Sequence, residues 1–268
     1  MSDGAQNDRL TVLQRLDIAT AERLANQLAR RLEEDLADSK SEATVWEPTD
    51  VERRDFVRGL LGIRGFRIHS DDVEKILEDR VERYRPEHQE WRLVRGLARA
   101  FDDLLEEAMQ GRGPSGWAIA ERFRSMTDGL ARFRNNTLRR DIPWDSIPGV
   151  PYPDAQRVGA LLDGLHEDAN YGDQHPDYEE MHPVRQAARL FWRFARISPF
   201  PDFNVVMAVL AASHLLCSRG YPAWVAQSDD RARLDALVKG ALPERSLFLE
   251  QRLLDTVQRK VWAPNPGR

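Results

Sequence analysis

The stretch that most constrains the fold lies between residues 183 and 218, where two apolar runs with helical spacing flank one short loop. Before the loop, apolar residues such as Val184, Ala187 and Phe191 recur at steps of three and four, which places them on one helix face. After it, the run from Val205 to Leu216 is so apolar that its helix is expected to be buried on all sides. Two adjoining buried helices at the centre of the chain predict an all-α, or mainly α, fold.

The loop between these helices, residues 197–204, reads Ile-Ser-Pro-Phe-Pro-Asp-Phe-Asn. Pro199 ends the first helix, and Asp202 or Asn204 can cap the second. A loop held at the N-terminus of a buried helix is also suited to bind an anion. Asp202 and Asn204 can therefore serve either as helix caps or as ligand-binding residues.

Helical patterns also cover most of the remaining chain. We predict an N-terminal helix and linker in residues 1–48, and a helical domain in residues 49–268 with its central motif at 197–209. The further predicted helices span residues 10–36, 50–61, 70–83, 86 to the turn at 111–116, 117–133, 154–167, 228–239 and 243–259.

Residues 135–153 differ from the rest because they are rich in Pro, Gly, Asn and Asp. This composition excludes a long helix and allows either a small β-hairpin or a folded loop. Arg139, Arg140, Trp144 and Tyr152 would place charge and aromatic surface on this segment. Since binding residues concentrate on loops that a rigid scaffold supports, we expect these four to contact a protein partner.

The central motif resembles that of the Fic/Doc (Fido) family, whose members transfer AMP or related groups to protein hydroxyls. The family pattern is His-Pro-Phe-x-Asp/Glu-Gly-Asn-Gly-Arg-x-x-Arg, preceded by a helix with His-Pro-x-x-x-Ala-Ala and followed by Gly-Tyr-Pro. This sequence has the matching residues His182, Pro183, Ala187, Ala188, Pro199, Phe200, Asp202, Asn204, Gly220, Tyr221 and Pro222. The resemblance implies a helical Fido-like fold, with residues 135–153 at the place of the family's β-hairpin flap.

The positions that would carry the chemistry depart from this pattern. Ser198 stands where the family has its His, and a serine takes no proton at neutral pH. Phe203 and Val205 replace the two glycines, and the β-branched Val205 disfavours a phosphate-binding nest with positive φ. Val206 and Val209 replace the two arginines that clamp phosphate by forked hydrogen bonds. The sequence therefore lacks the catalytic base, the glycines of the phosphate-binding loop and the two phosphate-binding arginines.

Two polar motif residues remain, and the resemblance gives each a role. Asp202 matches the position that helps to hold a magnesium ion, and Asn204 matches one that shapes the phosphate pocket. A lone carboxylate holds magnesium weakly, because magnesium sites combine one or two carboxylates with substrate phosphates. The catalytic candidates are thus limited to the degenerate positions Ser198, Asp202 and Asn204, and we expect Mg²⁺ and ATP only if the chain is a divergent transferase.

A second resemblance concerns the inhibitory helix of many family members, whose Glu pairs with the second motif arginine. The segment that starts at Gly62 aligns with this helix, so Arg64 replaces the inhibitory Glu and Phe66 replaces an Asn. Val209 replaces the second motif arginine with which that Glu pairs. Because both partners of the inhibitory ion pair are replaced, we expect a site that needs no inhibition.

Composition narrows the remaining function classes. The 268 residues carry 39 basic and 44 acidic side chains in a mixed distribution, which argues against a nucleic-acid surface. The single cysteine, Cys217, lies in the apolar helix and is expected in the core. Trp117, Trp192 and Trp224 are expected to pack in the core or in a groove. No window suits a transmembrane helix, and the polar start is unlike a signal peptide, so we expect a cytoplasmic protein without membrane contact.

Three functions remain open. The first is a Fido-fold protein that lacks transferase activity and binds a protein or ligand through its groove. The second is a divergent transferase that moves a nucleotidyl or other phosphate-linked group to a protein hydroxyl. The third is a helical scaffold, with homo-oligomers allowed, in which side chains fill the groove.

Overall fold

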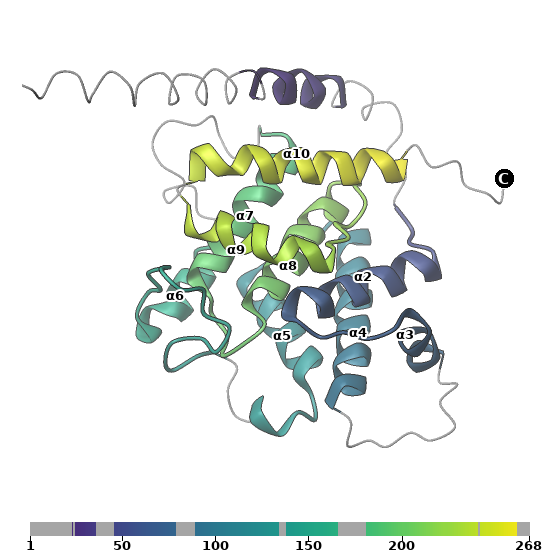
Figure 1. The fold of residues 1–268 in the computed structure, drawn as a ribbon, viewed down its shortest axis with the longest axis vertical. Helices are drawn as coiled ribbons and strands as arrows, with labels where there is room; N and C mark the ends of the chain where they lie inside the picture. Colours follow the sequence, from purple (N-terminus) through teal and green to yellow (C-terminus); the bar gives the residue numbers. More distant parts are fainter. Residues whose placement is uncertain are drawn as a thin grey trace, which may run out of the picture.

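The computed structural model describes residue 23 and residues 25–35, 46–78, 89–133, 138–165, 181–240 and 242–261 (Figure 1). Within these ranges every regular element is a helix, which confirms the all-α prediction. The α-helices are α2 (Asp50–Arg64), α3 (Ser70–Leu77), α4 (Gln89–Met109), α5 (Gly116–Thr127), α6 (Val158–Asp163), α7 (Pro183–Ile197), α8 (Asn204–Ser218), α9 (Arg231–Lys239) and α10 (Leu242–Val261), with short 3-10 turns η1 (Ala131–Phe133), η2 (Ala155–Arg157) and η5 (Ser228–Asp230).

Helix α8 lies at the centre of the molecule (Figure 1). It packs along α7 and also contacts α2, α4 and α5, while α7 contacts α6, α9 and α10. All residues of α8 from Asn204 to Leu216 are buried, as its apolar sequence predicts, and the last two are half-buried. The motif loop that precedes α8 is therefore held deep inside the helical assembly.

Local sequence signals explain where several helices begin. Thr49 and Glu52 form a reciprocal capping box at α2, and the Ser115 hydroxyl accepts from the Ala118 N–H at α5. His182 caps α7, where its Nδ1 accepts from the Val184 N–H at 3.1 Å, with Pro183 at the first helical position. His182 itself is buried.

Two predicted helices are shorter than the sequence suggested. The helix expected over 117–133 ends at Thr127, because Gly129 turns the chain at a φ of 73°. The helix expected over 154–167 is split into η2 and the short α6, which ends before Gly164. The predicted ends of the helices at 70–83 and 10–36 lie partly outside the described residues.

The described part of the N-terminal helix, residues 25–35, packs on the same core as the rest of the chain. Leu28 and Leu32 are buried in it, and Arg31 forms a salt bridge of 2.8 Å with Asp255 on α10. Figure 1 shows this helix, in purple, alongside α10. Among the described residues no helix is long and apolar enough to cross a membrane.

Candidate functional site

The motif loop, residues 198–203, joins α7 to α8 and is buried throughout. Both of its ends adopt left-handed backbone conformations, with φ of 44° at Ser198 and 63° at Phe203. The Ser198 hydroxyl donates to the Ala195 carbonyl oxygen at 2.7 Å. That hydroxyl therefore closes the last turn of α7.

Asp202 is the most enclosed polar residue of the loop, with 0% of its surface exposed. Arg64, at the end of α2, holds its carboxylate with two hydrogen bonds, Nε to Oδ1 at 2.6 Å and Nη2 to Oδ2 at 3.1 Å. The Phe203 N–H donates to Oδ1, and Arg132 Nη2 lies 3.4 Å from Oδ2. The hydrogen bond to Asp202 is the largest of the effects that raise the pKa of Arg64. The carboxylate is fully engaged by protein groups.

Phe203 is buried between aromatic rings and guanidinium groups. Its ring stacks on Phe66 with centroids 6.2 Å apart and lies 6.0 Å from the ring of Phe133. The guanidinium carbons of Arg64 and Arg132 each lie 5.6 Å from its centroid. A bulky residue with positive φ is strained, so these contacts must offset a backbone cost of about 1–2 kcal/mol.

The N-terminus of α8 is occupied by a carboxylate from another part of the chain. Asp145 accepts from the Asn204 backbone N–H at 2.7 Å and from the Asn204 side-chain amide at 2.8 Å. The Asn204 side-chain oxygen in turn accepts from the Phe200 N–H. Burial raises the pKa of Asp145, against the lowering effect of the Asn204 hydrogen bond. The prediction that Asp202 or Asn204 caps α8 is wrong, because no side chain of the loop accepts from its first turn.

Asp145 belongs to a segment that we call the cover loop, residues 138–153. In this segment the structure has turns and no strand, so the folded-loop alternative holds there, while 135–137 lie outside the described residues. Its backbone is tied to the motif loop by hydrogen bonds from the Arg139 N–H to the Pro199 oxygen and from the Trp144 N–H to the Pro201 oxygen. The cover loop is thus fastened onto the motif loop at two points.

The four expected partner-binding residues divide into two groups. Arg139 is only 5% exposed and donates to the carbonyl oxygens of Ser198, Asp141 and Pro153, so its predicted surface position is wrong. Tyr152 is half-buried, its hydroxyl accepts from the Ile147 N–H at 2.8 Å, and burial raises its pKa. These two fix the loop from inside.

Arg140 and Trp144 do lie on the surface, together with a residue that the sequence did not single out. Trp144 is 54% exposed and Ile142 is 70% exposed. The Trp144 ring lies 5.6 Å from that of Phe133, with the Arg132 guanidinium 5.9 Å from its centroid. We call Arg140, Ile142 and Trp144 the exposed tip of the cover loop.

Comparison with solved structures identifies the fold. The chain superposes on residues 134–508 of Fic-1 from C. elegans with a TM-score of 0.65 and 15% identity, over 97% of this chain and 78% of that one. A Fic family protein from Desulfovibrio desulfuricans gives a TM-score of 0.62 at 17% identity, covering 89% and 74% of the two chains. A Fic-domain signalling protein from Bacteroides thetaiotaomicron gives 0.58 at 18% identity, covering 88% and 94%. This chain has the Fic fold. No protein-family model and no curated protein matches its sequence.

The position that the resemblance assigns to magnesium is engaged by protein groups in this chain. Asp202 is buried, and Arg64 occupies both of its oxygens with a positive charge where the ion would need to bind. Among the residues that the structure describes, no group of three His, Cys, Asp or Glu side chains is placed to hold a metal. The one carboxylate at this position is therefore already paired with a guanidinium.

The segment that resembles the inhibitory helix contacts the motif after all. The sequence suggested a site without restraint, because both partners of the family's Glu–Arg pair are replaced. In the structure Arg64, at the Glu position, pairs with Asp202, and Phe66 stacks on Phe203. An ion pair thus joins these two segments, with the basic residue on the segment that resembles the inhibitory helix and the acidic residue in the motif loop.

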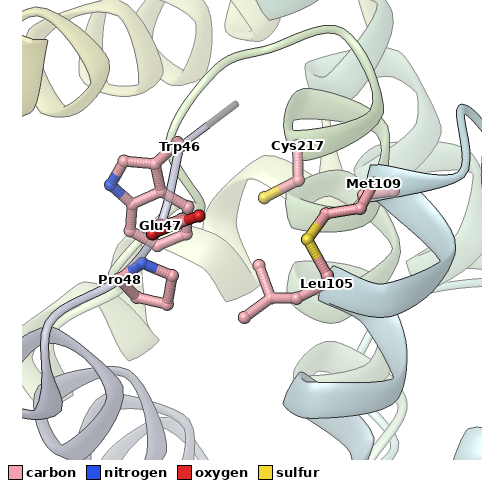
Figure 2. Close-up of a pocket in the computed structure, with 7 residues that line it drawn as sticks. Trp46, Glu47, Pro48, Leu105, Met109 and Cys217 are labelled. Atoms are coloured by element: carbon pink, nitrogen blue, oxygen red, sulfur yellow. The ribbon is translucent and has the colours of Figure 1, made fainter. Parts of the chain in front are cut away.

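Other residues singled out from the sequence lie apart from the motif loop. His214 is buried in α8 with Nε2 2.8 Å from the Arg112 oxygen, as expected for a core histidine. Trp224 is buried and Trp192 half-buried, but Trp117 is 69% exposed, contrary to the expectation that it packs in the core or in a groove. Cys217 is half-buried and lines an apolar cavity of about 250 Å³ with Trp46, Leu105 and Met109 (Figure 2).

Proposed function

We propose that this Fic-fold chain is a protein-binding module that does not transfer nucleotides. The observation that supports this proposal most is the buried ion pair of Asp202 with Arg64. Breaking a buried pair by removing one partner typically costs about 3–5 kcal/mol. Magnesium would have to displace the Arg64 guanidinium from both Asp202 oxygens before any nucleotide chemistry began.

The proposed absence of transfer also has a chemical basis. Ser198 offers no proton acceptor, and its hydroxyl already donates to Ala195. Phe203 fills space beside the α8 N-terminus, whose first N–H is bonded to Asp145. We therefore propose that the chain has no resident Mg²⁺ or ATP.

The proposed binding surface is the exposed tip of the cover loop. Ile142 and Trp144 present apolar area next to Arg140, and aromatic and arginine side chains are the usual anchors of interfaces. Arg139, Asp145 and the two backbone hydrogen bonds to the motif loop hold the tip in place. A preorganised loop loses little entropy on binding, which favours affinity. Because the described loop has no strand, the partner would bind through side chains and not by strand addition.

A quantitative affinity capture tests this proposal. Tagged wild-type protein is compared with Trp144→Ala and with Trp117→Ala, which removes an exposed tryptophan from α5 as the matched control. We expect one set of partners that wild type and Trp117→Ala retain and that Trp144→Ala loses, with unchanged thermal stability. If Trp144→Ala unfolds the protein, or retains every partner, the surface is wrong and the scaffold function is favoured.

A further inference from the structure

A shallow cavity of about 330 Å³, widely open to solvent, lies between the end of the cover loop, α6 and the last turns of α7. Its volume falls within the range of about 300–1,000 Å³ in which small-molecule sites usually lie. The walls are largely rings and apolar side chains, contributed by Pro151, Tyr152, Pro153, Leu161 and Trp192. This cavity is separate from the exposed tip that we propose as the protein-binding surface.

The two aromatic walls are held in fixed positions. The Trp192 Nε1–H donates to the Gly240 carbonyl oxygen at 3.2 Å, and the Tyr152 hydroxyl accepts from the Ile147 N–H at 2.8 Å. The Trp192 N–H therefore needs no new acceptor when a ligand binds, and the Tyr152 ring is tied to the cover loop through its hydroxyl. Fixed apolar walls of this kind favour a planar apolar body.

The charged side chains that line the cavity are all positive. Its lining includes Arg193 and Arg196 and no carboxylate. Arg193 is nearly buried and its terminal nitrogens donate to the carbonyl oxygens of Gly164 and Leu165, so its position is fixed. A positively charged cleft with low-dielectric walls concentrates anions.

Arg196 is the residue that can bind such an anion directly. Its Nη1 donates to the Val238 oxygen at 3.1 Å, and its guanidinium lies 5.0 Å from the ring centroid of Trp192. Among the described residues no carboxylate forms a salt bridge with it, and its Nε and Nη2 make no hydrogen bond there. A half-exposed guanidinium with two donors left is a good receptor for a carboxylate or phosphate.

We propose that this cavity is a binding site for a small aromatic anion, with its ring against Trp192 and Tyr152 and its carboxylate or phosphate on Arg196. The Arg196 guanidinium lies over one face of the Trp192 ring, so the ring and the acidic group of the ligand would bind at neighbouring points, which matches an acidic group joined to a ring by a short link. This site is independent of the proposed protein-binding function and of the motif loop's nucleotide chemistry.

Calorimetric titration of the full chain with benzoate, phenyl phosphate and the neutral benzyl alcohol tests the site. We expect one-to-one saturable binding of the two anions and none of the alcohol. Arg196→Gln should weaken binding at least about tenfold, and Arg196→Lys should fall between this variant and wild type because the charge stays but the fork is lost. The control is Arg157→Gln, which removes the same charge from an exposed position outside the lining.

Any of three results overturns the proposal. The first is that neither anion shows saturable binding up to about 10 mM, and the second is that benzyl alcohol binds as tightly as benzoate. The third is that Arg157→Gln weakens binding as much as Arg196→Gln does. Should Arg196→Gln fail to fold, Arg196→Lys decides the question alone: unchanged affinity for phenyl phosphate contradicts the site, and a severalfold loss supports it.

Discussion

Asp145 and Asn204 are joined by two hydrogen bonds of 2.7 and 2.8 Å, although they lie 59 residues apart in the chain. Through this contact a carboxylate of the cover loop satisfies the first N–H of the central helix α8. An anion at that position is favoured by the helix dipole. The protein thus places a carboxyl group of its own at this helix terminus, where burial raises its pKa.

The Asp145 contact is expected to stabilise the whole fold. Asp145→Ala leaves the buried Asn204 backbone N–H without its acceptor and the Asn204 amide with only the Phe200 oxygen, which should lower the free energy of unfolding by about 2–4 kcal/mol. Urea denaturation measures this change. Asp141→Ala, on the exposed part of the same loop, is the control and should stay within about 0.5 kcal/mol of wild type. Equal effects of the two variants would contradict the role of Asp145.

The raised pKa of Asp145 predicts a pH dependence with a definite sign. Because its folded pKa lies above the ordinary value of 3.8, its contribution to stability is largest at low pH and is lost as pH rises through the folded pKa. The unfolding free energy of wild type minus that of Asp145→Asn should therefore decrease from about pH 4 upward. Denaturation of both proteins across this range measures the difference. A difference that is constant or rises with pH would sink this prediction.

The Arg64–Asp202 pair should behave as a coupled buried ion pair. Arg64→Gln leaves Asp202 buried with only the more distant Arg132, and we expect a loss of about 3 kcal/mol in stability. Adding Asp202→Asn removes the uncompensated charge, so the double variant should be more stable than Arg64→Gln alone. A double-mutant cycle by urea denaturation gives the coupling energy. Additive effects of the two substitutions would show that the pair contributes nothing.

The positive φ of Phe203 makes its replacement by glycine less costly than usual. Phe203→Gly loses aromatic burial but relieves a strain of about 1–2 kcal/mol. Phe200→Gly is the matched control, since Phe200 is also buried in the motif loop and its φ is not positive. The Phe203 variant should be the more stable of the two by about 1–2 kcal/mol in denaturant titration. The opposite order would mean that Phe203 is not strained.

The sequence predicts the fold here because its signals are local. Pro199, Phe200, Asp202 and Asn204 keep a spacing that marks the motif loop, and the apolar run of α8 predicts its burial. Cap residues such as Thr49 and His182 also act within one helical turn. These features depend on near neighbours along the chain, so they can be read without a structure.

The partners of the candidate site could not be predicted in the same way. Asp145 meets Asn204, and Arg64 meets Asp202, across 59 and 138 residues of chain. Burial of Arg139 was also missed, because a guanidinium inside a loop is recognisable only from the carbonyl oxygens that surround it. One signal was available: Arg64 replaces a Glu in the resembled inhibitory helix, and such a charge reversal suggests an acidic partner nearby.

Binding of ATP with magnesium to the wild-type chain tests the central claim most directly. If the Arg64–Asp202 pair and Phe203 occupy the place of ligand and ion, calorimetric titration should give no dissociation constant below about 1 mM. Labelled ATP should leave no label on the chain or on added proteins. A micromolar dissociation constant, or robust labelling that Asp202→Ala abolishes, would contradict the account and establish a divergent transferase.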